Sequence, residues 1–259
     1  MQTAFYAFHF AVGSLVGFLS GLLGIGGGIV MFPLLLYLPP VLGLGTLEVR
    51  SITGLTMAQS FFASLSAMLF YNRQRLVNRR LVLSLGLSLF LSSLAGSMAS
   101  KHVDDNFILL VFGVLAFTAA FMMLMPRSYS EDDLKEDRVS FNRTVAIVLG
   151  VALGFFLGLV GQGGAFIIIP ILLYVLKIPL RVALGSMLAI NLFSSTAGLA
   201  GKVATGQVPF VMAAALLLGA IPFARIGGIV GQRTHTRFLK WLLALLITAT
   251  AIKVVSGIF

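Results

Sequence analysis

The sequence lacks cysteine and has few charged residues. Without cysteine there can be no disulfide, no thiolate metal site and no redox chemistry through sulfur. Charged residues make up 10% of the 259 residues, against about 25% in an ordinary soluble domain. So few charges cannot cover a soluble surface, and 59% of the residues are hydrophobic. The composition excludes a soluble enzyme or nucleic-acid-binding protein and predicts an integral membrane protein.

Acidic residues are absent from the apolar segments as well. All eight carboxylates lie in connections between them, at Glu48, Asp104, Asp105, Glu131, Asp132, Asp133, Glu136 and Asp137. Proton relays and cation carriers normally keep carboxylates at membrane depth, so neither is expected. The three histidines are scattered, and we predict no catalytic residue, no metal site and no cofactor. An anion is the class of substrate that remains.

Eight apolar segments predict an all-α polytopic membrane protein. They cover 5–38, 50–71, 81–100, 107–125, 143–176, 182–201, 208–231 and 238–257. A spanning helix needs about 20 apolar residues, and six segments fit one crossing each. The first and fifth segments are longer and carry a glycine cluster near their middle. Each of these two is predicted to be a re-entrant helical hairpin whose limbs reach only part way through the membrane.

The two halves of the sequence repeat each other, which is typical of secondary transporters. Nine residues recur 137 positions later, namely Gly13, Gly17, Phe18, Gly21, Gly24, Gly26, Gly27, Pro33 and Tyr37. After the next loop the offset becomes 131, as in Arg50 with Arg181 and Gly54 with Gly185. We therefore predict a first membrane repeat at 1–125, a polar cytoplasmic linker at 126–142 and a second membrane repeat at 143–259.

The positive charges favour hairpins over simple crossings for the two glycine segments. With hairpins, thirteen of the 18 lysines and arginines lie on one side of the membrane. Arg50, Lys101, Lys202 and Lys253 then lie on the other side, which is a clear positive-inside bias. With eight simple spans the charges divide almost evenly. The hairpin topology makes the halves inverted repeats, each a re-entrant hairpin followed by three transmembrane helices.

The doubled motif GSLVGFLSGLLGIGGGIVMFPLLLY at 13–37 and GVALGFFLGLVGQGGAFIIIPILLY at 150–174 resembles the TauE/SafE family of sulfite and organosulfonate transporters. The resemblance covers nearly the whole chain. It implies a transporter or exporter of small sulfur-containing anions such as sulfite, thiosulfate or organosulfonates, in a prokaryotic cytoplasmic (inner) membrane. The second motif departs from the first at Gln162 and Ala165, so the two halves need not contribute equally.

The glycine breaks are the predicted substrate site. Each break is followed by a helix whose first amide N–H groups lack partners and whose dipole is positive at that end. Such helix ends bind oxyanions when no side chain intervenes. The predicted ligands are Gly24, Gly26, Gly27 and Gly28 in the first break and Gly161, Gln162, Gly163 and Gly164 in the second. We expect the breaks to meet near the membrane midplane and to border a cavity.

Polar residues inside apolar segments supply further candidate ligands. They are Gln59, Ser60, Ser64, Asn191 and Ser195, and Ser60 and Ser64 correspond to Asn191 and Ser195 in the repeat. The alternative for the serines and Asn191 is interhelical hydrogen bonding. Gln162, at the tip of the second break, is the strongest single candidate.

Four further glycines and one arginine inside the apolar segments also need an interpretation. Gly13, Gly17, Gly150 and Gly154 are predicted to permit close helix packing. Arg225 either snorkels to the interface or raises the potential along an anion path.

The function predicted is secondary transport of a small sulfur-containing anion by alternating access. The alternatives are a passive anion channel and a structural or assembly membrane protein without a substrate. The sequence does not define the transported anion, the direction of transport, the coupling ion or the oligomeric state.

Overall fold

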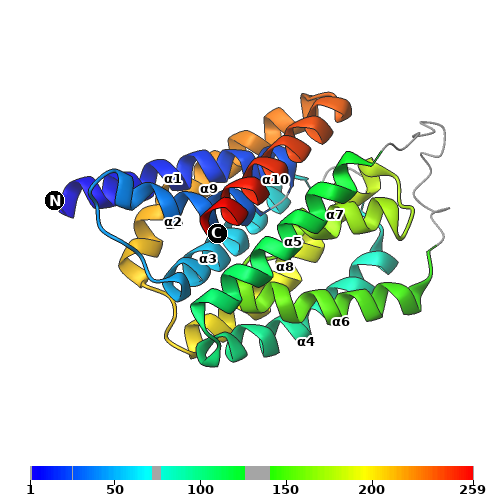
Figure 1. The fold of residues 1–259 in the computed structure, drawn as a ribbon. Helices are drawn as coiled ribbons and strands as arrows, with labels where there is room; N and C mark the ends of the chain where they lie inside the picture. Colours follow the sequence, from blue (N-terminus) through cyan, green and yellow to red (C-terminus); the bar gives the residue numbers. More distant parts are fainter. Residues whose placement is uncertain (1, 25, 72–76, 126–140, 259) are drawn as a thin grey trace.

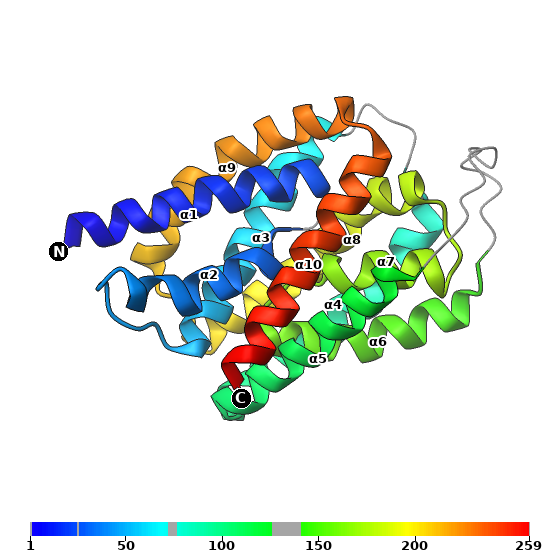
Figure 2. The same ribbon diagram turned by 45° about the horizontal axis from the view of Figure 1, so that its top comes forward.

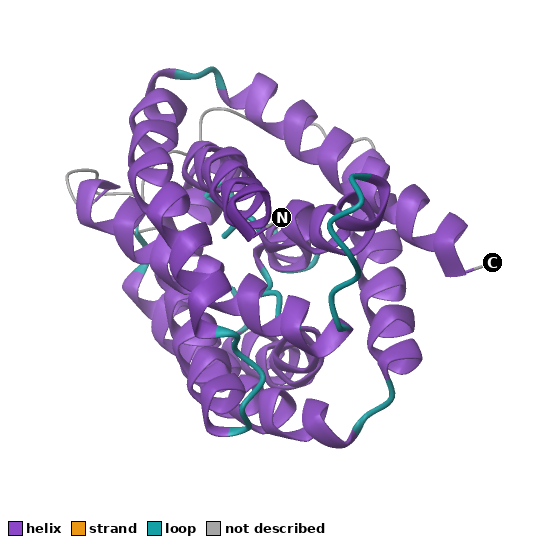
Figure 3. Cartoon of the chain, turned by 90° about the vertical axis from the view of Figure 1, so that its left-hand side faces the viewer, coloured by secondary structure: helices purple, strands orange, loops and turns teal. Residues whose placement is uncertain are grey.

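The computed structural model describes residues 2–24, 26–71, 77–125 and 141–258 (Figure 1). Within these ranges the chain forms helices and connecting loops, and no strand (Figure 3). Most of the predicted linker at 126–142 lies outside the described residues. The prediction of an all-helical protein is confirmed.

Each half of the chain contributes five α-helices in the same order. The first half has α1 (Gln2–Leu23), α2 (Gly28–Val41), α3 (Val49–Tyr71), α4 (Arg79–Ala99), a short 3₁₀ helix η1 (Ser100–His102) and α5 (Asp105–Leu124). The second half has α6 (Arg143–Val160), α7 (Ala165–Tyr174), α8 (Leu180–Ala204), α9 (Phe210–Arg233) and α10 (Thr236–Ile258). The eight predicted segments are helical, and the two glycine segments divide into two helices each, at the predicted glycines.

Six described helices are long and apolar enough to cross a membrane: α1, α4 with η1, α5, α6, α8 and α9. The prediction that both limbs of each hairpin stop part way is wrong for the first limbs. At about 1.5 Å per residue, α1 extends about 33 Å and α6 about 27 Å. The second limbs are short, because α2 has 14 residues and α7 has 10. Each glycine segment therefore joins a long helix to a short one.

Helix α5 shows how the sequence places apolar residues against lipid. Phe107, Leu110, Val114, Phe117 and Phe121 recur every three or four residues, and all five side chains are exposed. This spacing puts them along one face of the helix. The small residues Ala116, Ala119 and Ala120 are buried against neighbouring helices. An exposed apolar stripe with small residues inside is the pattern of a helix in lipid.

The repeats interlock rather than standing side by side. Helix α1 packs along α9, and the corresponding pair, α6 and α4, packs along the opposite side of the molecule (Figures 1 and 2). Glycines permit these contacts: a Cβ at Gly17 would lie 2.6 Å from Ala220 Cα, and one at Gly154 would lie 2.9 Å from Leu89 O. The packing role predicted for these glycines is confirmed.

The loops gather at two ends of the molecule. Figure 1 shows the N-terminus and the connections at 42–48, 103–104 and 205–209 to the left and lower left. The α7–α8 and α9–α10 connections lie toward the right, where the Tyr174 hydroxyl donates a hydrogen bond to the Met125 carbonyl at 2.9 Å. The distribution of lysines and arginines predicts the same grouping of loops. The inverted orientation of the repeats in a membrane remains a prediction.

Candidate functional site

Both glycine breaks end in the same local geometry. The N-cap residues of α2 and α7 are Gly27 and Gly164, with φ of 71° and 99°. This left-handed conformation is disfavoured for residues with a Cβ, which explains glycine at both positions. Neither N-cap makes a side-chain hydrogen bond, so the first amides of each helix lack the usual side-chain cap.

The two breaks meet at the centre of the molecule. A Cβ on Gly26 would lie 3.3 Å from Ser60 Oγ, and one on Gly163 would lie 3.2 Å from the same oxygen. Both glycines also contact the side-chain amide of Asn191. Ser60 lies midway along α3, and its hydroxyl donates to the Gly26 carbonyl at 2.9 Å. The structure thus brings together two glycines that correspond in the repeat, as the sequence predicted.

Asn191 of α8 links the repeats and points a free acceptor at the second break. Its Nδ2 donates to Ser64 Oγ at 2.6 Å. Its Oδ1 is buried without a hydrogen-bond partner among the described residues. That oxygen lies 2.7 Å from the position of a Cβ on Gly163. Asn191 therefore has one half of its amide fixed and the other half available.

Two glutamine side chains at the breaks have no hydrogen-bond partner among the residues that the structure describes. Gln59 and Gln162 are fully buried, and no described residue bonds their Nε2 or Oε1 atoms. Gln59 Nε2 lies 2.8 Å from the position of a Cβ on Gly27, and Gln162 Oε1 lies 2.6 Å from that on Gly28. Burying an unpaired amide costs about 1–3 kcal/mol. Two such amides beside the breaks make Gln59 and Gln162 candidates for binding a ligand or water.

Three predicted ligands have other roles in the structure. The Ser195 hydroxyl donates to the Asn191 carbonyl of its own helix at 2.6 Å. The Gly161 carbonyl accepts a hydrogen bond of 2.7 Å from the Thr56 hydroxyl. Gly24 lies near α8, where a Cβ would be 3.6 Å from Leu184 O. Gly24 and Gly161 therefore shape the breaks, and the Ser195 hydroxyl is already used within its own helix.

The breaks are closely packed, contrary to the expected open cavity. A Cβ on Gly27 would lie 2.6 Å from Val16 Cγ1, and a Cβ on Gly164 would contact the Leu157 side chain. A larger residue such as valine at Gly27 or Gly164 would therefore clash and destabilise the protein. Substitution of the polar side chains is the cleaner test of the site.

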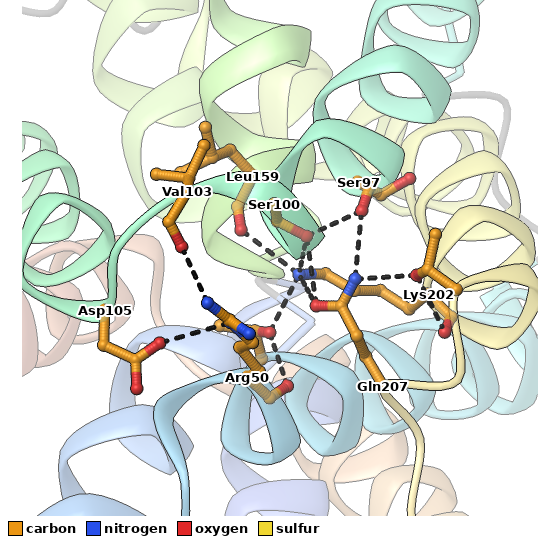
Figure 4. A network of polar contacts seen from close by, with 10 residues as sticks. Arg50, Ser97, Ser100, Val103, Asp105, Leu159, Lys202 and Gln207 are labelled. Atoms are coloured by element: carbon orange, nitrogen blue, oxygen red, sulfur yellow. Dashed lines mark hydrogen bonds and ion pairs between the residues drawn. The ribbon is translucent and has the colours of Figure 1, made fainter.

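The sequence interpretation missed a polar cluster that contacts the end of α6, next to the second break. Its centre is Lys202 of α8, which is fully buried and bonds Thr53, Ser100, Leu159 and Gln207 (Figure 4). The charge distribution predicts only the side of the membrane on which Lys202 lies, and its partners come from four separate segments. Arg225, by contrast, is exposed on α9 beside the exposed Phe223 and Ile226.

Comparison with known proteins identifies the family. The sequence model described as "Sulfite exporter TauE/SafE" matches residues 9–254, which is nearly the whole chain. The chain belongs to the TauE/SafE family. Its glycine breaks, at 24–28 and 161–164, both lie within the matched range.

Relatives of this TauE/SafE chain are membrane transporters by name. A probable membrane transporter protein of Xylella fastidiosa (strain 9a5c) is 31% identical, over 94% of this chain and 92% of its own length. The probable membrane transporter protein YunE of Bacillus subtilis (strain 168) is 24% identical, over 96% and 97%. No solved structure matches. The family and its relatives make this chain a membrane transporter.

Proposed function

We propose that the protein is a secondary transporter of small sulfur-containing anions such as sulfite, thiosulfate or organosulfonates. The proposal rests on the meeting of the two glycine breaks around Ser60 and Asn191, with the unpartnered amides of Gln59 and Gln162 beside them. The two helix starts add backbone donors and the positive ends of two dipoles. A small oxyanion accepts hydrogen bonds in several directions, so it suits the donors at the breaks, which are the Nε2 groups of Gln59 and Gln162 and the backbone N–H groups of the two helix starts. Ser60 and Asn191 hold the two breaks together.

The closed packing of the breaks favours a carrier over an open channel. Gln59, Ser60, Gln162 and Asn191 are all fully buried. An anion can then reach the site only if helices move apart on one side. Two repeats that correspond in sequence and interlock across the centre allow equivalent movements on each side, which is the basis of alternating access. We propose this mechanism and a location in a prokaryotic cytoplasmic membrane.

Flux into liposomes tests the function. The purified protein is reconstituted, and uptake of sulfite, thiosulfate, sulfoacetate, sulfate and chloride is measured with and without a proton gradient. The proposal predicts saturable uptake of at least one sulfur-containing anion and acceleration of labelled uptake by the same unlabelled anion inside. Unsaturable uptake with no counterflow would support a channel. Absence of flux for every sulfur-containing anion would contradict the proposed substrate class.

A further inference from the structure

Lys202 places a positive charge deep inside the protein. Its side chain is fully buried, and Nζ lies 2.7 Å from Ser100 Oγ, 2.8 Å from Thr53 Oγ1, 3.0 Å from Gln207 Oε1 and 3.2 Å from the Leu159 carbonyl (Figure 4). A protonated lysine has three N–H donors and no acceptor. Four oxygens around the nitrogen are therefore suited to an ammonium group.

The groups around Lys202 donate their own hydrogen atoms elsewhere, so their oxygens face Lys202 as acceptors. The Thr53 hydroxyl donates to the Arg50 carbonyl at 2.7 Å, so its oxygen faces the ammonium as an acceptor. The Ser100 hydroxyl has the Ser97 carbonyl at 2.6 Å as its own acceptor. The Gln207 amide nitrogen donates to Thr205 Oγ1 at 2.7 Å, which leaves its oxygen for Lys202. The whole cluster is ordered around a cation.

No carboxylate compensates this charge among the described residues. The charged groups nearby are Arg50 of α3 and Asp105 of α5, which form an ion pair of 3.5 Å with each other. Arg50 also donates to the Val103 carbonyl. All four oxygens bonded to Lys202 are neutral. A buried charge without a counterion is costly, and in membrane proteins it is generally functional.

The charge lies at the junction of the second hairpin. Leu159 is in the last turn of α6, whose final carbonyls form the negative end of the helix dipole. Lys202 binds one of these carbonyls. Thr56, one turn from Thr53 on α3, binds the Gly161 carbonyl in the break itself. The charge of Lys202 thus offsets the partial negative charge at the end of α6. The partial positive charge at the start of α7 is then not cancelled by the end of α6.

In the first half of the sequence, the position that corresponds to Lys202 does not hold a cation. In the repeat, Lys202 corresponds to Tyr71, Thr53 to Leu184 and Ser100 to Gly231. The carbonyl that corresponds to that of Leu159 belongs to Leu22, and it packs directly on Gly231, where a Cβ would lie 2.5 Å away. The lysine and two of its hydroxyl acceptors in the second half are therefore not repeated in the first half.

We propose that Lys202 determines the charge specificity of transport by making the second break the electropositive half of the anion site. This inference rests on the proposed function. Lys202 acts through the field that it creates at Gly161–Gly164, not by contact with the anion. Doubly charged anions should therefore gain more from it than singly charged ones.

Replacing Gln207 by glutamate tests the inference most sharply. Q207E places a carboxylate beside the ammonium and cancels its field without removing the lysine. Because the buried charge gains a counterion, the melting temperature should hold or rise. Thiosulfate, a dianion, should bind about tenfold more weakly, and ethanesulfonate, a monoanion, should lose less. A merely structural lysine would not make stability and affinity change in opposite directions.

Two further variants complete the experiment. Lys202→Met removes the charge and should weaken thiosulfate binding at least as much as Q207E. Lys101→Gln removes an exposed charge at the same end of the molecule and should leave binding unchanged. If K202M does not fold, Q207E decides alone. Wild-type affinity for thiosulfate in Q207E overturns the inference and leaves the proposed function intact, whereas a wild-type protein that binds neither anion overturns both.

Discussion

Asn191 Nδ2 lies 2.6 Å from Ser64 Oγ, and this hydrogen bond joins the two repeats at the point where the glycine breaks meet. The other half of the Asn191 amide faces Gly163 and has no hydrogen-bond partner in the described part of the chain. Exchange of this amide for a carboxylate changes charge with little change in size. Its effect therefore reports on the charge of any ligand at the site.

Asn191→Asp should reduce anion transport by more than about tenfold, because a carboxylate at the breaks repels an anion in a medium of low dielectric. Sulfite or thiosulfate uptake into liposomes is the measurement. Asn106→Asp is the matched control, since Asn106 is exposed, and it should transport normally. Normal transport by N191D would exclude Asn191 from the anion path.

Replacing Gln162 should raise the stability of the protein and lower its affinity for the anion. Gln162→Met keeps the length of the side chain and removes the unpaired amide, so the protein should gain about 1 kcal/mol of stability. Anion affinity should fall, because a ligand is lost. Gln207→Met is the control, because the Gln207 amide is bonded at both ends and its loss should destabilise the protein. Thermal unfolding and binding are measured on the same samples. Loss of stability in Q162M would mean that the amide has partners in the native protein.

Two adjacent glycines of α9 test the account of helix packing. A Cβ at Gly227 would lie 2.9 Å from Leu22 N on α1, whereas one at Gly228 would have only Gly21 O, at 4.0 Å. Gly227→Ala should therefore cost about 1–3 kcal/mol through overpacking. Gly228→Ala should be neutral or stabilising by up to about 1 kcal/mol, because alanine favours the helix. Equal melting temperatures for the two variants would contradict the described contact between α1 and α9.

The topology is accessible to cysteine labelling, because the native chain has no cysteine. Asn106 and His235 are both exposed and lie at the two ends of the molecule. Cysteine at 235 should react with an impermeant maleimide from the cytoplasmic face, and cysteine at 106 from the opposite face. Reaction of both from one face would refute the inverted-repeat topology.

The sequence predicts the architecture well because the signals are local. Runs of apolar residues mark the helices, and Gly24 and Gly161 mark the ends of α1 and α6 because glycine there permits a left-handed turn. The repeat also predicts that Gly26 and Gly163 share an environment, and in the structure both contact Ser60 and Asn191. Correspondence between halves carries three-dimensional information of this kind.

The environment of Lys202 could not be predicted in the same way. Gln207 is five residues from Lys202, but Thr53, Ser100 and Leu159 lie on distant segments, and no spacing in the sequence relates those three to Lys202. The close packing at Gly27 and Gly164 was missed for a similar reason, because the contacts of Gly27 include Val16 of α1 and Gln59 of α3. Only comparison of the repeats offers a signal, since a lysine in one half stands where the other half has Tyr71.

The central claim is that the two glycine breaks together bind one anion. Equilibrium binding of sulfur-radiolabelled thiosulfate to the purified protein, with competition by unlabelled compounds, tests it most directly. The account predicts saturable binding of one anion per chain. Sulfite and ethanesulfonate should compete, neutral dimethyl sulfone should not, and N191D should abolish the binding. Equal competition by dimethyl sulfone, or unchanged binding in N191D, would contradict an anion site at the breaks.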